Sequence, residues 1–414
     1  MVKRSTNKIT RILAIETSCD ETAIASIEAP RGARSFRVLS NIVLSQVAMH
    51  AEWGGVVPNL AKREHQKALV PLLLQALKQS WLFNSKRKNK NVKLQFKIQK
   101  SLPAILERES ELLKQLQEKI IPLPKPPIDL IAITQGPGLE PALWVGVNFA
   151  RALSVVWDIP LIGINHMEGH IVSALIEPKR ISNVKVKMSN LNLKSVVYPA
   201  LALLVSGGHT ELVFIKKPLH HQIIGETRDD AAGEAFDKVA RILGLGYPGG
   251  PVISSEANLE TADSLGCPVP KLPRPMIHSK DFDFSFSGLK TAVLYLVRDL
   301  EKQGADIKKL RPAICKEFQD AVVDVLVAKT IRAAKQYKVK TILLGGGVAA
   351  NKELRKRLEK ETDDILPRVT LHLPQSNITG DNALMIAAVA IFRRKYAKKT
   401  IWKTMKPNAN MRLC

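Results

Sequence analysis

One pattern occurs twice in this chain and limits the folds that are open to it. Residues 11–28 predict two short strands around a polar turn, because apolar residues alternate with others on each side of the turn. Residues 198–215 repeat the arrangement as a strand, a glycine turn and another strand. Sequence identity between the two hairpins is low. We nevertheless predict a structural repeat of two related lobes.

The length and composition agree with two folded lobes. The chain has 414 residues, of which 45% are hydrophobic and 24% charged, as in a globular protein. No window of about 18 residues is free of polar interruption, which argues against a membrane span. The predicted organisation is an N-terminal lobe (1–178), a connection (179–195), a C-terminal lobe (196–392) with nucleotide and metal motifs, and a basic tail (393–414).

The charge favours a polyanionic partner such as nucleic acid, because the formal net charge is +24. The alternative is that the charge only keeps the protein in solution. The four cysteines form no CxxC pair, which favours a reducing compartment. The basic N-terminus hints at a transit peptide but is too short, because the first strand begins near Arg11. We expect the cytoplasm rather than the mitochondrial matrix.

Residues 80–127 read as a basic helical insertion. Residues 86–100 contain seven Lys or Arg and no acid, and a helical pattern follows from Ser101 to Ile120. A PLPKPP stretch ends it. Two interpretations stay open: a solvated surface excursion, or an arm that contacts phosphates.

His166 and His170 are spaced for a metal. Four residues apart on a helix, they face the same side and suit two ligands of one divalent ion. Asp381, in a predicted helix start, is a candidate third ligand. The alternative is two structural histidines. The motif is not HExxH, because Met167 follows the first histidine, so the usual protease base is missing.

Two glycine turns follow apolar strands, at 206–210 and 345–347. Glycine allows close approach of a ligand, and exposed N–H groups can cradle phosphate. With the acidic turn at 16–21, the set resembles the phosphate and adenosine elements of the actin, Hsp70 and sugar-kinase superfamily. The predicted fold class is therefore α/β, a two-lobed actin-like ATPase (ASKHA, ribonuclease-H-like) fold with duplicated lobes.

Two further segments carry reactive side chains. Residues 232–241 place Asp237 on a short helix, where it could accept hydrogen bonds from a ribose or belong to a solvated face. Ser285, Ser287 and Lys290 could pass for a Ser–Lys nucleophile pair, but this spacing also arises at ordinary helix starts.

Nine motifs occur in an order that resembles one family. They are IETSCDET, GVVPNLAKREH, GPGL, NHMEGH, LLVSGGHTEL, DDAAGEAFDKVARILGLGYPGGP, FSFSGLKTAV, LLGGGVAAN and TGDNALMIA. Together they resemble the tRNA N6-adenosine threonylcarbamoyltransferase (TsaD) family, in its bacterial and mitochondrial branch. Members were once called O-sialoglycoprotein endopeptidases.

The resemblance implies an activity and a set of site residues. The activity is transfer of threonylcarbamoyl from threonylcarbamoyl-AMP to N6 of adenosine 37, in tRNAs reading codons that begin with A, which gives t6A. By resemblance, one divalent metal (iron(II) or zinc, with magnesium possible alongside nucleotide) binds His166, His170 and Asp381. The substrate contacts carried over are Leu204, Val205, Ser206, Gly207, Gly208, Asp237, Gly250 and Asn351. Asp20 and Glu21 are the acidic pair needed for activity.

The resemblance also implies partners. These are the anticodon loop of tRNA, a separate synthase that supplies threonylcarbamoyl-AMP, and either a paralogue lacking the metal site with a small ATPase, or a second copy of the chain. No membrane is implied. Other functions considered are a small-molecule kinase or ATPase of the same fold, a metalloprotease, and a nucleic-acid-binding scaffold with a dead site.

Overall fold

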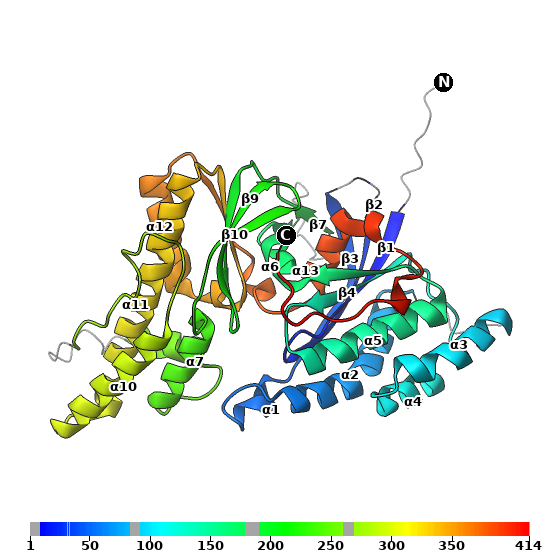
Figure 1. Ribbon diagram of the computed structural model, residues 1–414, viewed down its shortest axis with the longest axis horizontal. Helices are drawn as coiled ribbons and strands as arrows, with labels where there is room; N and C mark the ends of the chain where they lie inside the picture. Colours follow the sequence, from blue (N-terminus) through cyan, green and yellow to red (C-terminus); the bar gives the residue numbers. More distant parts are fainter. Residues whose placement is uncertain are drawn as a thin grey trace. The chain divides into compact units, whose positions relative to one another are not determined.

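The computed structural model describes residues 9–30, 32, 34–82, 92–178, 190–259 and 269–413, with the side chains of 92–97 excepted. The chain forms two compact units (Figure 1). Unit 1 comprises the described residues of Met1–Ala48, Val56–Lys194 and Asp381–Arg412. Unit 2 comprises those of Met49–Gly55, Ser195–Gly380 and Leu413–Cys414.

Unit 1 is built on a seven-stranded sheet in the order β5-β4-β1-β2-β3-β7-β6. The predicted hairpin is confirmed as β1 (Ile9–Glu16) and β2 (Glu21–Pro30), which pair antiparallel. β3 (Ser35–Ser45) continues antiparallel, while β4 (Leu130–Gly136) and β5 (Leu161–Asn165) run parallel to β1. β7 (Asn190–Leu193) and β6 (Ile176–Pro178) extend the far edge.

Helices cover both faces of this sheet. α2 (Pro58–Gln79) and α5 (Glu140–Trp157) bury their apolar sides against alternate residues of β1, such as Leu13 and Ile15. α13 (Ala383–Arg393) contacts β1, β2 and β4 and pairs with α6 (His166–Ser173). α1 (Val47–Ala51) contains the first passage of the chain from unit 1 to unit 2.

The insertion is part of the core of unit 1. It forms α3 (Val92–Ile105) and α4 (Ser110–Lys119), so the single helix predicted from Ser101 to Ile120 is wrong. A turn at 106–109 separates the two helices, and Leu106 at its start is fully buried. The apolar side chains that produced the helical pattern pack against α2 and α5: Ile98, Leu102, Ile105, Leu112, Leu116 and Ile120. Most of the basic stretch 86–100 lies outside the described residues or side chains.

The predicted lobe boundaries differ from the observed units at two places. The C-terminal lobe was predicted to run to residue 392, but α13 belongs to unit 1 because its side chains are buried against that sheet. Asn190–Leu193, predicted as connection, is strand β7 of unit 1. Residues 179–189 of the predicted connection lie outside the described residues.

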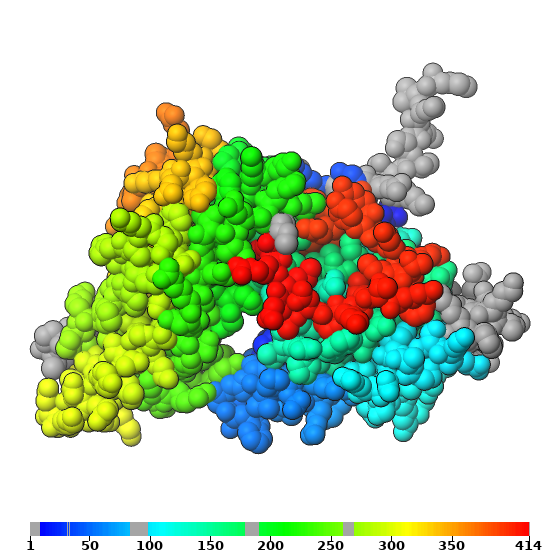
Figure 2. Space-filling view, viewed as in Figure 1, coloured from blue at the N-terminus to red at the C-terminus, as the bar shows by residue number. Residues whose placement is uncertain are grey.

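The basic tail is folded onto unit 1. After α13 come two single turns, η3 (Arg394–Tyr396) and η4 (Ile401–Lys403), and then an extended segment. Met405 is buried in the core beside α5, and Lys398 pairs with Leu161 of β5 through their backbones. Figure 2 shows the segment as a continuous red surface along unit 1.

Unit 2 repeats the strand order of unit 1. Its sheet runs β10-β9-β8-β11-β12, formed by β8 (Ala200–Val205), β9 (Thr210–Lys217), β10 (His220–Glu226), β11 (Thr341–Gly345) and β12 (Thr370–His372). β10, β9 and β8 are antiparallel, and β11 and β12 are parallel to β8, which is the pattern of β3-β2-β1-β4-β5. The duplicated actin-like fold class is therefore confirmed.

The helices of unit 2 surround a core of its own. They are α7 (Ala232–Ile242), α8 (Gly249–Ala257), α10 (Ser287–Lys302), α11 (Ile307–Gln336) and α12 (Lys352–Ile365), with single turns η1 (Gly347–Ala350) and η2 (Ser376–Ile378). Phe236, Phe284, Phe286 and Phe318 are fully buried among them. This core places the β8–β9 turn, η1 and the start of α7 close together.

Candidate functional site

Three side chains of unit 1 form a compact donor set. His166 and His170 lie one turn apart on α6, with their Nε2 atoms 3.1 Å from each other. Oδ1 of Asp381, just before α13, is 3.4 Å from Nε2 of His166 and 3.2 Å from Nε2 of His170. Because these nitrogen and oxygen donors converge within 4.8 Å, they fit the ligands of one divalent metal.

Both helix starts are capped by asparagine. The side chain of Asn165 accepts hydrogen bonds from the N–H groups of Met167 (2.8 Å) and Glu168 (3.2 Å). Asn382 accepts from the N–H of Met385 at 3.0 Å. Each capping asparagine is next to a metal donor in the sequence, so the caps fix the helix starts beside which His166 and Asp381 lie.

α6 and α13 are held together by an ion pair between buried Glu168 and half-buried Arg393, and by a close approach of the two helices. Nε of Arg393 donates to both carboxylate oxygens of Glu168, at 2.7 and 2.8 Å. A Cβ on Gly169 would lie 3.0 Å from the Met385 side chain, so glycine lets the helices approach. Helix pairing therefore brings Asp381 to the two histidines.

His166 has a carboxylate behind it. Its Nδ1 lies 3.2 Å from Oε2 of Glu16, at the end of β1. Glu16 also accepts hydrogen bonds from the hydroxyl of Thr134 and, at 2.6 Å, from the N–H of Ser18. A carboxylate on the far nitrogen is the usual way to orient a metal-binding imidazole. Sequence reasoning missed Glu16, although its position at a strand end beside the acidic turn was a usable signal.

Opposite charges set the ionisation of the donor set. Burial acts to lower the pKa of His166, but the carboxylates of Asp381 and Glu16 outweigh it and raise that pKa well above its usual value. Burial likewise acts to raise the pKa of Asp381, yet His166 and His170 hold it well below its usual value. A metal ion must therefore displace a firmly held proton.

The acidic turn lies near the donor set. Burial, helped by the charges of Asp381 and Asp20, raises the pKa of Glu21 to about 10. The same surroundings raise the pKa of the Cys19 thiol well above its usual value, burial first, so the thiol stays neutral. The structure thus gathers Asp20 and Glu21 into a carboxylate-rich site that suits a cation.

His65 of α2 supports this turn from behind and is fully buried. Its Nε2 donates to the carbonyl oxygen of Cys19 at 2.9 Å, and its Nδ1 lies 2.7 Å from the Thr22 hydroxyl. The backbone N–H of Gln46 adds a 2.9 Å bond to the carbonyl of Asp20. His65 is the last residue of the motif GVVPNLAKREH, but the sequence alone did not indicate that it supports the acidic turn.

In unit 2 the predicted substrate loop is the β8–β9 turn. Leu204 and Val205 are buried at the end of β8, and the turn closes through Ser206 and His209. A Cβ on Gly207 or Gly208 would meet no atom within 4 Å, so this backbone faces open space. A Cβ on Gly346 would instead lie 2.3 Å from the Val205 carbonyl, so that glycine serves packing.

Of the three other predicted contacts, Gly250 and Asn351 lie at helix starts of unit 2, and Asp237 lies within α7 with its side chain bound to the start of α8. Oδ1 of Asp237 accepts from the N–H of Gly249 at 2.7 Å, beside Gly250, whose α-carbon also faces open space. Asn351 caps α12 by accepting from the N–H of Leu354 at 2.9 Å. Its amide nitrogen donates to Ser254 and Gln319, both at 2.9 Å. The Asp237 and Asn351 side chains therefore also hold secondary structure.

The possible Ser–Lys nucleophile is contradicted. The hydroxyls of Ser285 and Ser287 both donate to Oδ2 of Asp229, at 2.5 and 2.7 Å. Asp229 also accepts from the backbone N–H groups of Phe286 and Ser287. These serines tie a loop to the start of α10, and in the described part of the chain neither is hydrogen-bonded to Lys290.

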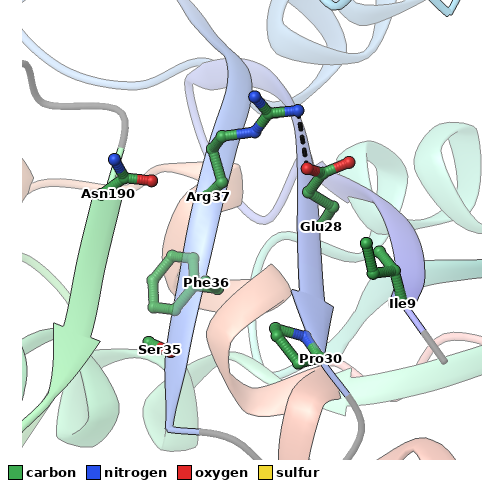
Figure 3. A pocket seen from close by; sticks show the side chains of 7 residues that line it. All are labelled: Ile9, Glu28, Pro30, Ser35, Phe36, Arg37 and Asn190. Carbon is green, nitrogen blue, oxygen red and sulfur yellow. Dashed lines mark ion pairs between the residues drawn. The ribbon is translucent and has the colours of Figure 1, made fainter. Parts of the chain in front are cut away.

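A separate hollow of about 310 Å³ lies at the other end of β1 (Figure 3). Ile9 and Phe36 line it, together with an ion pair of Glu28 and Arg37 at 2.6 Å. Arg11 also approaches Glu28, at 3.5 Å. Because β1 runs from this hollow to Glu16, the hollow lies far from the metal donors.

A membrane span requires a helix that is both long and apolar. Among the described residues, no helix meets both requirements.

Duplicated sheets and a His–His–Asp donor set define an actin-like α/β protein with a candidate metal centre. A family model for tRNA N6-adenosine threonylcarbamoyltransferase matches residues 37–85 and 110–388. Proteins of that name from Bacillus cereus and Geobacillus kaustophilus are each 40% identical to the chain, covering 97% and 95% of it and 96% and 94% of their own lengths.

The chain therefore belongs to the tRNA N6-adenosine threonylcarbamoyltransferase family, as predicted, and is a transferase of tRNA modification. Residues 86–109, between the matched ranges, include α3 and the whole basic stretch 86–100. A crystal structure of HypF in a phosphate- and nucleotide-bound form has a TM-score of 0.46 and 11% identity, covering 93% of this chain and 46% of HypF.

Proposed function

We propose that this chain transfers a threonylcarbamoyl group from threonylcarbamoyl-AMP to N6 of adenosine 37, in tRNAs that read codons beginning with A. Family membership supports the transferase class and the tRNA substrate. The observation that carries the proposal is the convergence of His166, His170 and Asp381 within 4.8 Å. The product would be t6A.

The donor set suits iron(II) or zinc, with magnesium reserved for the nucleotide. Two imidazole nitrogens and one carboxylate oxygen leave room for a substrate oxygen, as catalytic sites require. When bound, the ion would supply Lewis-acid polarisation of a carbamoyl or phosphate oxygen. Glu16 would keep the His166 ring oriented for it.

The remaining roles fall to backbone and acidic groups. We assign the adenylate to the turn of Leu204–Gly208, because the open backbone at Gly207 and Gly208 can approach a phosphate. Gly250 offers a second such position, with Asp237 and Asn351 fixing the helix starts around it. Asp20 and Glu21 would supply carboxyl groups beside the metal donors, and that of Glu21 stays protonated until a cation binds.

The attacking group is a poor nucleophile, so orientation must supply much of the rate. The exocyclic amine is conjugated with the adenine ring, and the base must leave its stack in the anticodon loop to react. No described side chain is assigned as general base.

The partners proposed are tRNA, a separate synthase for threonylcarbamoyl-AMP, and either a paralogue with a small ATPase or a second copy of the chain. The proposed location is the cytoplasm.

A protease mechanism lacks its base. Glu168 is the only carboxylate within the HMEGH motif; it is buried, and both of its oxygens accept hydrogen bonds from Arg393. It is therefore committed to holding α6 against α13.

The test is t6A formation measured by nucleoside mass spectrometry. Purified protein would be incubated with unmodified tRNA and a synthase that generates threonylcarbamoyl-AMP. We expect t6A from the parent and none from His166→Ala/His170→Ala, whereas the exposed control His220→Ala should match the parent. If the parent forms none, paralogue and ATPase are added, and continued absence of t6A would refute the proposal.

A further inference from the structure

The last residues of unit 1 form a strap, defined here as residues 406–412. It is bound through its backbone. Nε2 of Gln135 donates to the carbonyl of Lys406 at 2.8 Å, and the N–H of Asn408 donates to the carbonyl of Gln135 at 2.8 Å. Gly138 donates its N–H to the carbonyl of Ala409 at 3.2 Å.

The strap ends on the residue that caps the metal-binding helix. Nδ2 of Asn165 donates to the carbonyl of Arg412 at 3.2 Å, while Oδ1 of the same amide caps α6. A planar amide held at its nitrogen has its oxygen direction fixed as well. The Arg412 carbonyl therefore selects the amide orientation that α6 needs, next to His166.

The strap also supports the acidic turn through the GPGL turn at 136–139. A Cβ on Gly136 would lie 1.8 Å from the carbonyl oxygen of Asn408. On the other side of the turn, Leu139 donates its N–H to the carbonyl of Ser18 at 2.7 Å. Ser18 in turn places its hydroxyl 3.5 Å from Oδ2 of Asp381.

We propose that the strap is a positioning element of the metal centre, acting on α6 through Asn165 and on the Ser18 turn through residues 136–139. None of its atoms is placed among the ligands. The inference rests on the proposed metal-binding role of His166, His170 and Asp381.

The test compares Asn165→Ser with Asn410→Ser in the full-length protein. Serine at 165 keeps an acceptor for the helix cap but loses the donor to Arg412. Residue 410 is an exposed strap position and receives the same chemical change. Metal-free proteins would be titrated with Co²⁺ alone. We expect Asn165→Ser to bind Co²⁺ about tenfold more weakly, with an altered ligand-field spectrum, and Asn410→Ser to match the parent.

A second variant, truncated after Met405, removes the whole strap and should weaken Co²⁺ binding by about 10–100-fold. Hydrogen exchange of the metal-free proteins gives an independent readout. The amides of Met167 and Glu168 should exchange at least about tenfold faster in Asn165→Ser and in the truncated protein. Circular dichroism would confirm that each variant is folded.

The outcomes separate the two ideas. A parent that binds no Co²⁺ refutes the proposed metal role, and the exchange data then still decide whether the strap orders α6. If the parent binds Co²⁺, and Asn165→Ser and the truncated protein bind it with the same affinity as the parent, the inference is overturned. Faster exchange without weaker binding overturns it too.

Discussion

At the scale of single residues, each charged group of the candidate metal site lies next to a group of opposite charge. His166 faces Glu16 on one side and Asp381 on the other, and Asp381 faces both histidines. Burial and the like charges of Asp381 and Asp20 instead leave the carboxyl of Glu21 protonated at neutral pH. A cation bound beside this turn would therefore favour the ionised form of Glu21.

Replacing Glu21 with glutamine should stabilise the metal-free protein. The pKa of Glu21 is raised from 4.5 to about 10 in the folded state. The unfolded state binds fewer protons between these values, so this residue makes stability fall as pH rises. We expect Glu21→Gln to gain about 1–3 kcal/mol near pH 8 and almost nothing near pH 4.5. Urea unfolding with a chelator at both pH values measures this.

The exposed Glu118→Gln is the matched control and should change stability at neither pH. The same Glu21→Gln variant should bind Co²⁺ more weakly, because it removes a carboxyl group that can ionise when a cation binds. A gain in stability that is equal at both pH values would contradict the assignment of the pKa.

Cys315 should behave as a buried probe of unit 2. Burial raises the pKa of its thiol from 9.0 to about 12. The unfolded thiol ionises first, so this residue makes stability fall between those pH values. With the other cysteines replaced by serine, we expect alkylation near pH 8.5 to be at least about 100-fold slower in the folded protein than in urea. Rapid labelling of the folded protein would show that α11, which carries Cys315, opens easily.

The resemblance singled out His166, His170 and Asp381, and the structure brings them together. Glu16, Asn165 and Arg393 were not predicted, because each acts on a residue far away in sequence or on an orientation that spacing does not encode. The pairing of Glu16 with His166, for example, depends on β1 lying beside β4, which in turn lies beside β5. Two signals were readable in the sequence: asparagine directly precedes HMEGH, and Glu16 stands at a predicted strand end beside the acidic turn.

At the scale of elements, the candidate centre depends on the pairing of α6 with α13. One helix carries both histidines, the other begins just after the aspartate, and an ion pair between buried Glu168 and half-buried Arg393 joins them. The sequence predicted both helices separately. It assigned them to different lobes because their pairing is long-range, and it merged α3 with α4 because an apolar pattern continues across the turn at 106–109.

Arg393→Met should cost about 2–4 kcal/mol of unfolding free energy, because it leaves the buried carboxylate of Glu168 unpaired. Adding Glu168→Gln should recover part of the loss, since a neutral amide needs no counter-charge. The control Lys399→Met breaks an exposed pair with Asp158 and should cost less than about 1 kcal/mol. Equal losses in urea unfolding for the two single variants would show that the α6–α13 pair is not special.

At the scale of the whole molecule, the net charge of +24 accompanies a folded basic tail. Exposed Lys398, Lys403 and Lys406 are held on unit 1 rather than on a free extension. A fixed array of cations loses less entropy on binding a phosphate backbone than a free chain does. The composition indicated nucleic acid, whereas the placement of the tail required the three-dimensional contacts of residues 398–412.

Replacing Lys398, Lys403 and Lys406 with glutamine should weaken tRNA binding and reduce the slope of log affinity against log salt by about 2. The control replaces Lys302, Lys308 and Lys309, which are exposed on unit 2, and loses the same charge. Filter binding at several salt concentrations measures both. If the two triple variants have the same slope, the tail contributes only to net charge.

The return of the chain to unit 1 has a consequence for its synthesis. A ribosome makes β1 to β5 and both histidines early, yet Asp381, α13 and the strap emerge only near the end. Unit 2 is nearly continuous, so it can fold while unit 1 still lacks a helix. A message broken near its 3′ end would therefore yield a product that keeps both histidines and lacks their aspartate.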